Sequence, residues 1–286
     1  MHNYFKRVLS SLPVIAMLMM PGVTAAMADE IPNLAVQEGD GDISATSGGV
    51  RPADGQPVAG GTYHETHLAY MFGDNAGNFR PDAPISRAEA AALLVRTELL
   101  NFESGITRLP PGVSSFDTFA DVSPDDWFFY YVAWAHNAGL INGRDGNFHP
   151  NAPITREEFA AILARTTTLR TADIPFSDLY RISDWAMAYV HTAFLADWIR
   201  GDHRGNFRPQ DNITRAEVAT SINRMLGRLD SFTTLNGLDM ENPEDIRRFH
   251  DLDDSVWYFP AVLGATNDHY LTRNSHGIIT WLQIIR

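Results

Sequence analysis

One sequence pattern occurs three times in this chain of 286 residues, and it constrains the fold more than any other feature. The pattern reads Gly-Asn-Phe-x-Pro-x-x-x-Ile-(Ser/Thr)-Arg-x-Glu, without a gap in any copy. We call each copy a cassette; the cassettes span residues 77–89, 146–158 and 205–217. A pattern that recurs along a chain is typical of repeat proteins, so each copy is expected to bury its apolar face against its neighbours.

The cassette predicts the start of a helix. Gly-Asn before Phe predicts a tight turn, because both residues tolerate positive φ. The Ser or Thr is expected to be the N-cap, the Glu at N3 completes a capping box, and the Ile before the cap forms a hydrophobic staple. We therefore assign structural capping roles to Ser86, Thr155, Thr214, Glu89, Glu158 and Glu217.

A second pattern also occurs three times: Phe-x-Asp, then Trp six or seven residues after the Asp, then Val five residues after the Trp. A helix is expected between Trp127 and Gly139, which suits the C′ position. The acidic and aromatic residues of the three copies are Asp121, Asp178, Asp251, Trp127, Trp185 and Trp257.

Together the two patterns resemble the two ends of the S-layer homology domain, and the resemblance covers about residues 63–286. It implies a mainly α fold: repeated helical modules in a pseudo-threefold bundle, with short loops and turns between the helices. It also implies binding of secondary cell-wall polymers, often through a pyruvylated sugar, in grooves between adjacent modules.

The Phe-x-Asp…Trp segment is the front half of such a module and the cassette segment is its back half.

Between residues 29 and 62, Gly and Pro stand among small polar residues, which predicts disorder because little apolar area is available for burial. The predicted divisions are a signal peptide at 1–28, a disordered linker at 29–62, an isolated back half at 63–102, complete modules at 117–170 and 174–228, a connector at 229–248 and an isolated front half at 249–286.

The two halves are therefore out of phase along the chain. We predict that the front half at 249–286 completes the back half at 63–102, because neither half can bury its apolar face alone. The alternative is a degraded fourth module that only caps the array.

The cassette arginines are candidate ligand contacts, because a cation at N1 opposes the helix dipole and so indicates another use. Beside the free N–H groups of the first turn, each would make a site for a carboxylate. The alternative is an ion pair with an acidic neighbour. These residues are Arg87, Arg156 and Arg215.

The other candidates keep two interpretations each. The tryptophans either stack on sugar rings or pack in the core. The Phe-x-Asp aspartates either accept sugar hydroxyls or cap the helix that follows. Three glycines precede the cassettes and either serve the backbone or permit close approach of a ligand: Gly73, Gly143 and Gly201.

Composition excludes several classes of site and partner. The chain has no cysteine, which excludes disulfides, thiolate metal sites and a lipoprotein anchor. A formal charge of −13 disfavours nucleic acids and anionic lipids as partners. An EF-hand counted from Asp74 or Asp145 has Ile85 or Arg156 where glutamate is required. We expect no metal site and no cofactor.

The N-terminus predicts export. Lys6 and Arg7 precede a short apolar run, and Ala26-Met27-Ala28 fits a cleavage site, so the mature chain is expected to begin at Asp29. The alternative is a retained membrane anchor. No second apolar stretch approaches about 20 residues, so no membrane span is expected after cleavage. We expect a secreted protein at the bacterial cell surface or wall.

The sequence is compatible with three functions. The first is non-covalent anchoring to a bacterial cell-wall polysaccharide, a pyruvylated secondary polymer linked to peptidoglycan. The second is a structural role, in which the modules self-assemble or bind other surface-layer proteins without a glycan. The third is an enzyme such as a glycan hydrolase, which we disfavour because no segment remains for a catalytic domain.

Overall fold

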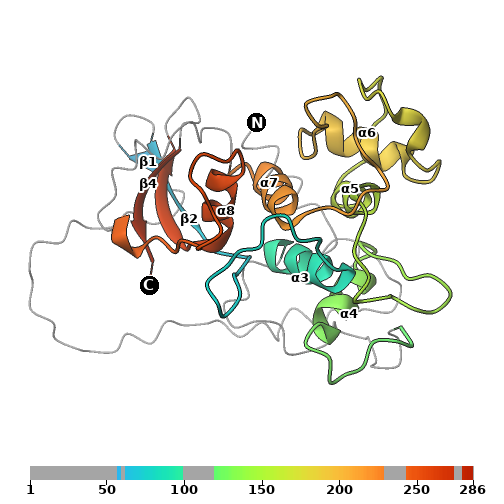
Figure 1. The fold of residues 1–286 in the computed structure, drawn as a ribbon, viewed down its shortest axis with the longest axis horizontal. Coiled ribbons are helices and arrows are strands. Elements are labelled where there is room, and N and C mark those ends of the chain that lie inside the picture. The colour runs from blue at the N-terminus through green and yellow to red at the C-terminus, as the bar shows by residue number, and fades with distance from the viewer. Residues whose placement is uncertain (1–56, 59–61, 99–118, 229–242, 274–278, 286) are drawn as a thin grey trace, which may run out of the picture. The chain divides into compact units, whose positions relative to one another are not determined.

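The computed structural model describes residues 57–58, 62–98, 119–228, 243–273 and 279–285 (Figure 1). The predicted signal peptide and most of the predicted linker and connector lie outside these residues. Within them the chain forms six α-helices: α3 (Arg87–Glu98), α4 (Phe129–Asn137), α5 (Arg156–Ala164), α6 (Met187–Leu195), α7 (Arg215–Met225) and α8 (Phe259–Thr266). Two short 3₁₀ turns span Leu179–Arg181 and Pro243–Asp245.

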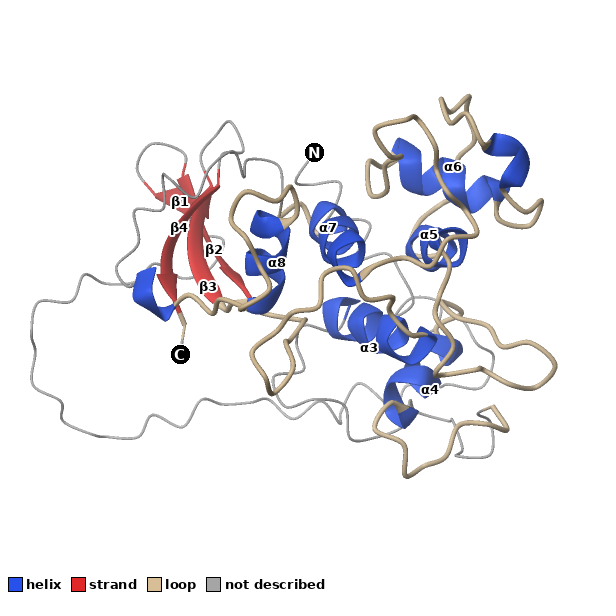
Figure 2. Cartoon of the chain, in the orientation of Figure 1, coloured by secondary structure: helices blue, strands red, loops and turns tan. Residues whose placement is uncertain are grey.

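A four-stranded antiparallel sheet joins the two ends of the described chain (Figure 2). Its order follows the sequence: β1 (Pro57–Val58), β2 (Thr62–His67), β3 (His269–Arg273) and β4 (Ile279–Ile284). In the central pair, Tyr63 lies opposite Arg273 and His67 opposite His269. The expectation of a mainly α fold is therefore wrong in part, because the fold also contains this sheet.

Two predicted segments contribute strands to the sheet. The linker was predicted to run to residue 62, but Pro57–Val58 and Thr62 belong to strands. The isolated front half at 249–286 contains β3 and β4 after its helix. Aromatic and β-branched residues such as Tyr270, Thr272 and Trp281 favour extended structure there.

Helix α8 packs against the sheet and builds its core. The residues of this apolar cluster are Ile246, Phe259, Leu263, Leu271, Trp281 and Ile284. The indole of Trp281 is 1% exposed and stacks on the His269 ring at 3.7 Å between centroids. The front half at the C-terminus is thus held to the strand that precedes the first cassette.

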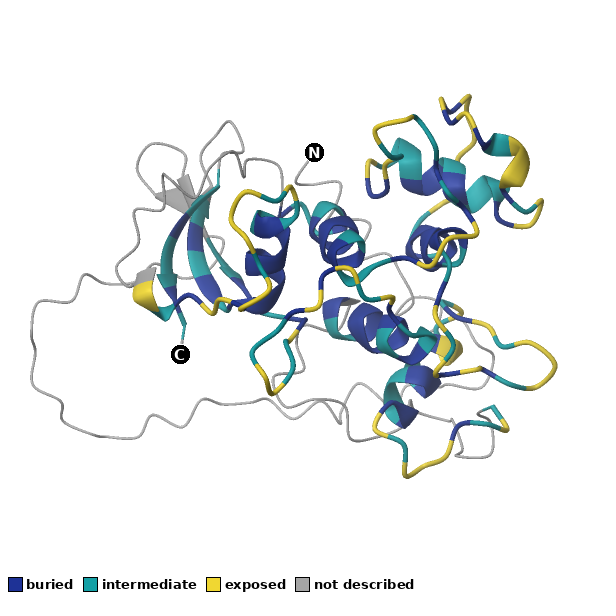
Figure 3. Cartoon of the chain, in the orientation of Figure 1, coloured by how far each residue is buried: buried dark blue, intermediate teal, exposed yellow. Residues whose placement is uncertain are grey.

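All three cassettes begin their helices with the predicted capping box. At α5 the Thr155 hydroxyl accepts the Glu158 N–H, and the Glu158 carboxylate accepts the Thr155 N–H. Thr214 with Glu217, and Ser86 with Glu89, make the same two bonds. The preceding isoleucine is buried in each copy, as a hydrophobic staple requires. The cassette helices α3, α5 and α7 are buried over much of their length (Figure 3).

The second residue with positive φ in the cassette turn is not the predicted one. The cassette glycines have positive φ, at 77° for Gly77, and so does the residue between Phe and Pro, at 57° for His149. The cassette asparagines do not have it. Sequence alone favours Asn because its side chain tolerates this conformation, whereas here the contacts described below impose it on the later residue.

The three cassettes contact one another through a closed ring of main-chain hydrogen bonds. The Ile154 N–H donates to the Ile85 carbonyl at 3.0 Å, the Ile213 N–H to Ile154 at 3.1 Å, and the Ile85 N–H to Ile213 at 3.2 Å. Each cassette helix also packs against the front-half helix that follows it in sequence: α3 with α4, α5 with α6 and α7 with α8. The wider pseudo-threefold bundle stays a prediction.

No helix in the described part of the chain is both long enough and apolar enough to cross a bilayer.

Candidate functional site

The Phe-x-Asp carboxylates hold the cassette turns. Both oxygens of Asp121 accept main-chain N–H groups, from Phe148 and from His149, each at 2.7 Å. The positive φ of His149 lets two successive N–H groups face one carboxylate. The other copies make the same pair of bonds at 2.7–2.8 Å: Asp178 with Phe207 and Arg208, and Asp251 with Phe79 and Arg80.

This geometry corrects one interpretation of these aspartates. Helices α4, α6 and α8 have no side-chain hydrogen bond at their N-caps, so the predicted capping role is wrong. The aspartate and its cassette are 27 residues apart in the middle copy and 172 apart for Asp251, and the local sequence does not reveal that pairing. Contact with sugar hydroxyls stays a prediction.

Each of the three glycines before the cassettes lies against the phenylalanine ring of a Phe-x-Asp pattern. A Cβ on Gly143 would lie 2.3 Å from Cε1 of Phe119 and 2.5 Å from the Asn147 carbonyl oxygen. The corresponding distance to a Phe Cε1 is 2.3 Å at Gly73 and 2.7 Å at Gly201. The close neighbour that requires glycine is thus an aromatic ring of this chain.

Each cassette arginine forms an ion pair with the capping glutamate of another cassette. Arg87 pairs with Glu158 at 3.0 Å, and its Nε donates to the Phe148 carbonyl at 2.8 Å. Its guanidinium also lies over the Phe148 ring, 5.0 Å from the centroid. The other two pairs are Arg156 with Glu217 at 2.8 Å and Arg215 with Glu89 at 3.8 Å.

These arginines therefore join the repeats, which is the ion-pair alternative. Burial lowers the pKa of Arg87, Arg156 and Arg215, and the facing glutamate offsets part of this effect. Arg156 is only 3% exposed. The capping glutamates thus have a second role that the capping box alone did not predict. Ligand contact by the arginines stays a prediction.

The three pattern tryptophans lie at the surface. Trp127, Trp185 and Trp257 are 57%, 50% and 64% exposed. The core interpretation is therefore wrong, and three large aromatic faces are accessible. Exposure of this size in a repeated position is typical of a binding surface.

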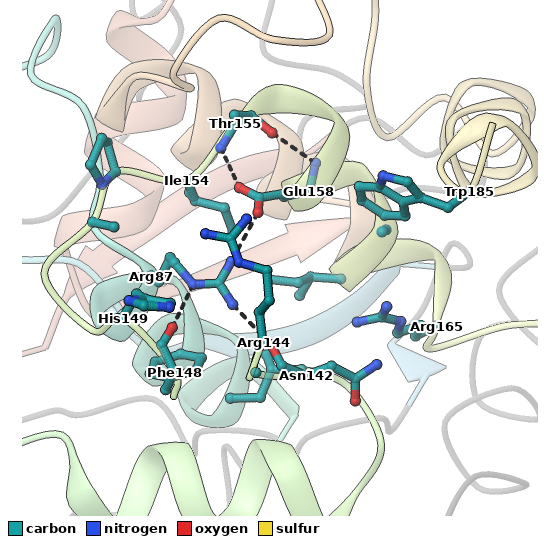
Figure 4. Close-up of a pocket in the computed structure, with 16 residues that line it drawn as sticks. Arg87, Asn142, Arg144, Phe148, His149, Ile154, Thr155, Glu158, Arg165 and Trp185 are labelled. Carbon is teal, nitrogen blue, oxygen red and sulfur yellow. Dashed lines mark hydrogen bonds and ion pairs between the residues drawn. The ribbon is translucent and has the colours of Figure 1, made fainter. Parts of the chain in front are cut away.

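One pocket brings several of the predicted residues together. It has a volume of about 640 Å³ and lies beside α5 (Figure 4). Arg87 reaches it from the first cassette, Arg144 and Arg165 line it from the middle repeat, and Trp185 lines it from the next front half. Gly143 and Glu158 also line it. An accessible aromatic beside several cations suits an anionic sugar.

A second pocket, of about 280 Å³, occupies a related place beside α7. Trp257, Arg224 and Arg200 line it, together with Asp197. Arg200 and Asp197 form a two-bonded ion pair at 2.6 and 2.7 Å. Trp127 lines neither of these two pockets.

Two of the pocket arginines, Arg165 and Arg224, occupy a repeated position that the sequence analysis did not single out. An arginine stands nine residues after the cassette arginine in every copy: Arg96, Arg165 and Arg224. Their recurrence at the same spacing in all three copies was enough to mark these side chains. Arg165 lies over the Tyr189 ring at 5.3 Å and donates to the Leu140 carbonyl at 2.9 Å.

Among the residues that the structure describes, no group of three or more His, Cys, Asp or Glu side chains is arranged to hold a metal ion. The arrangement instead offers cationic and aromatic contacts to a ligand.

Three segments of the chain, residues 66–91, 118–160 and 175–219, match the family model of the S-layer homology domain. The chain is 31% identical over 232 residues to cell surface glycoprotein 1 of Acetivibrio thermocellus, covering 76% of this chain and 9% of that protein. It is 31% identical over 233 residues to the cellulosome-anchoring protein of the same species, covering 79% of this chain and 48% of that protein.

An amylopullulanase of Thermoanaerobacterium thermosulfurigenes is 34% identical over 155 residues, which cover 52% of this chain and 8% of that enzyme. The chain thus spans about half or less of the length of these relatives. The three matched segments fall on the cassettes and front halves whose contacts are described above, and this chain belongs to the S-layer homology domain family.

Proposed function

We propose that this chain attaches non-covalently to an acidic polysaccharide of a bacterial cell wall and resides at the cell surface. The observation that carries the proposal is the pocket beside α5, where Trp185 stands with Arg87, Arg144 and Arg165. Guanidinium groups form paired hydrogen bonds to carboxylates, and an indole face covers the apolar face of a sugar ring. The names of two relatives, a cell surface glycoprotein and a cellulosome-anchoring protein, support this location.

The finer part of the proposal concerns the acidic group. Family resemblance favours a pyruvyl ketal on a secondary cell-wall polymer. Its carboxylate has the planar pair of oxygens that arginine recognises. Export through the signal peptide at 1–28, with a mature N-terminus at Asp29, belongs to the same proposal; sequencing of the secreted protein tests it.

We also propose that the front half at 249–286 and the back half at 63–102 form one module. Asp251 and Phe249 contact the first cassette as Asp121 and Phe119 contact the second. The first back half then has a front half, and the chain contains as many complete modules as it has cassettes.

We propose no catalytic role for these modules. A glycoside hydrolase needs a pair of carboxylates directed at one bond. Here Glu158 and Glu217 are held by arginines and capped N–H groups, and Asp121 by two main-chain N–H groups. The amylopullulanase relative is consistent with this, because the shared segment is a small part of that enzyme.

Co-sedimentation with cell-wall sacculi tests the proposal. The purified chain should pellet with intact sacculi and remain in solution with sacculi stripped of their secondary polymer. The variant Trp127→Ala/Trp185→Ala/Trp257→Ala should fold normally, because all three side chains are exposed, and should lose binding. Tyr180→Ala is the matched control, because Tyr180 is an 85% exposed aromatic that lines neither described pocket.

Failure of the unaltered chain to bind intact sacculi would sink this function. The competing function, self-assembly or binding of a surface-layer protein without a glycan, rests on the same exposed tryptophans. Polymer-free, concentration-dependent assembly that the tryptophan variant abolishes would favour it.

A further inference from the structure

The three repeats differ in charge at one loop position. The residue after the conserved glycine is Asp74 in the first copy and Asp202 in the third, but Arg144 in the second. Asp74 accepts the N–H groups of Ala76 and Asn78 at 2.9 Å, and Asp202 accepts two equivalent N–H groups. In those copies the acidic side chain holds the loop in its turn.

The middle loop keeps its turn without that side chain. It is one residue shorter, and the main chains of Arg144 and Asn147 bond to each other at 2.8 and 3.0 Å. Since the loop does not use the Arg144 side chain, its guanidinium is left to line the pocket beside α5 (Figure 4).

The charges in this pocket do not balance. Glu158 pairs with Arg87, and the oxygens of the nearby Asp121 accept main-chain N–H groups. Across the described residues, Arg144 and Arg165 have no acidic partner. Two cations thus line the pocket without a carboxylate partner, and Arg165 donates only to the Leu140 carbonyl among the described residues. After burial, which is the main cause, repulsion by both lowers the pKa of the neighbouring Arg87.

The pocket beside α7 has a smaller excess. Arg200 is paired with Asp197, which leaves Arg224 as the remaining cation of its lining. The related position beside α3 differs again, because the Arg96 guanidinium lies over two rings, Phe72 at 5.7 Å and Tyr131 at 5.1 Å. Arg165 lies over one ring, that of Tyr189, at 5.3 Å.

We propose that the three grooves are unequal and that the groove beside α5 is the selective site for an anionic sugar, with Arg144 as its specificity determinant. This inference rests on the proposed function and refines it. The carboxylate or phosphate of the ligand bridges Arg144 and Arg165, while the sugar ring lies against Trp185. The pocket beside α7 binds the same ligand more weakly, because only Arg224 in its lining has no carboxylate partner among the described residues, whereas two arginines lack one in the pocket beside α5.

Calorimetry with defined saccharides tests the assignment. The probes are a methyl glycoside with a pyruvyl ketal, glucose 6-phosphate and uncharged methyl glucoside. The unaltered chain should bind one acidic probe most tightly at one site per chain and should not bind the neutral one. The stronger of the two acidic probes identifies the anion as carboxylate or phosphate.

Arg144→Gln should weaken that site about tenfold or more, as expected for loss of one charge-assisted hydrogen bond. Arg144→Asp, which restores the residue type of the other copies, should weaken it further. Arg204→Gln is the matched control, because it removes one exposed arginine from the corresponding loop of the third copy without touching either pocket.

The outcomes separate this inference from the proposed function. If no acidic saccharide and no sacculus binds, the proposed function fails. If the unaltered chain binds but Arg144→Gln behaves like Arg204→Gln, the function stands and the assignment of Arg144 is overturned. Equal loss of affinity from Trp185→Ala and Trp257→Ala, with equal sites, would also overturn the inequality of the grooves.

Discussion

The carboxylate of Asp251 accepts the main-chain N–H of Phe79 at 2.8 Å, across 172 residues of sequence. Its second oxygen accepts the next N–H, that of Arg80, at 2.7 Å. Asp251→Ala removes both acceptors. It should lower the free energy of unfolding by about 1–3 kcal/mol, because a hydrogen bond to a charged group contributes more stability than one between neutral groups. Urea unfolding measures it. Asp254→Ala removes an exposed aspartate three residues further along the chain and should change stability by less than about 0.5 kcal/mol. Equal losses from the two variants would contradict a stabilising role for the Asp251 hydrogen bonds.

The ion pairs between cassettes should differ in strength with burial. The Arg156 and Glu217 side chains are 4% and 16% exposed, whereas those of Arg87 and Glu158 are 17% and 32% exposed. Glutamine keeps an acceptor for the capping box but leaves the arginine uncompensated. Glu217→Gln should therefore cost about 3 kcal/mol of unfolding free energy, and Glu158→Gln about 1 kcal/mol. Denaturant midpoints at equal slope measure the difference, and a larger loss at Glu158 would refute the burial argument.

Acid should also weaken the Glu217 site. Burial raises the pKa of Glu217, but Arg156, the capping N–H and Arg208 outweigh it, so the pKa lies below its ordinary value. A carboxyl with a depressed pKa contributes stability above its unfolded pKa of about 4.3 and loses it as pH falls. Below about pH 4.5, the stability of the unaltered chain should fall more steeply than that of Glu217→Gln. Parallel curves would argue against this contribution.

His269 in β3 should make the stability of the folded chain depend on pH in a second, higher pH range. Burial, reinforced by His67, holds the pKa of His269 well below its ordinary 6.5. Near pH 6.5 the unfolded chain binds a proton at this histidine, whereas the folded chain does not. The free energy of unfolding is therefore unaffected by His269 above about pH 6.5 and falls as the pH drops below about 6.5. His269→Phe keeps a ring against Trp281 and should flatten the melting temperature between about pH 7 and about pH 5. His203→Gln, an exposed control, should leave the pH profile unchanged.

The close approach of phenylalanine to glycine should make one alanine substitution worse than another. An added Cβ meets Phe119 and Asn147 at 2.3 and 2.5 Å at Gly143, but Phe176 and Asn206 at 2.7 and 3.0 Å at Gly201. Gly143→Ala should therefore cost about 3 kcal/mol and Gly201→Ala about 1–2 kcal/mol, the range for overpacking. Thermal unfolding of both variants gives the comparison. The reverse order would show that these contacts do not determine the cost.

Sequence was sufficient for the capping boxes and for the glycine that ends α4, because these depend on residues close together along the chain. Ser86, Thr155 and Thr214 begin their helices as predicted, because a capping box is formed by residues three apart. Gly139 follows α4 with φ of 71°, as a C′ residue should.

Contacts between distant segments were beyond the same reasoning. The pairing of β2 with β3 joins residues about 200 positions apart, and no local pattern marks which short strand finds which partner. The two hydrogen bonds accepted by Asp121 and the exposure of Trp185 could not be predicted for the same reason, because both depend on where distant segments of the chain lie. Arg165 could have been predicted, because an arginine recurs nine residues after the cassette arginine in all three copies.

The ring of hydrogen bonds among Ile85, Ile154 and Ile213 has a consequence for how the protein comes apart. A linear repeat array frays, because its outermost units have one neighbour each and detach first. In a closed circuit every unit donates to one neighbour and accepts from another, so none is outermost. Release of any one cassette breaks two links at once and leaves the other two as an open pair. We therefore expect the three repeats to unfold together in a single cooperative transition.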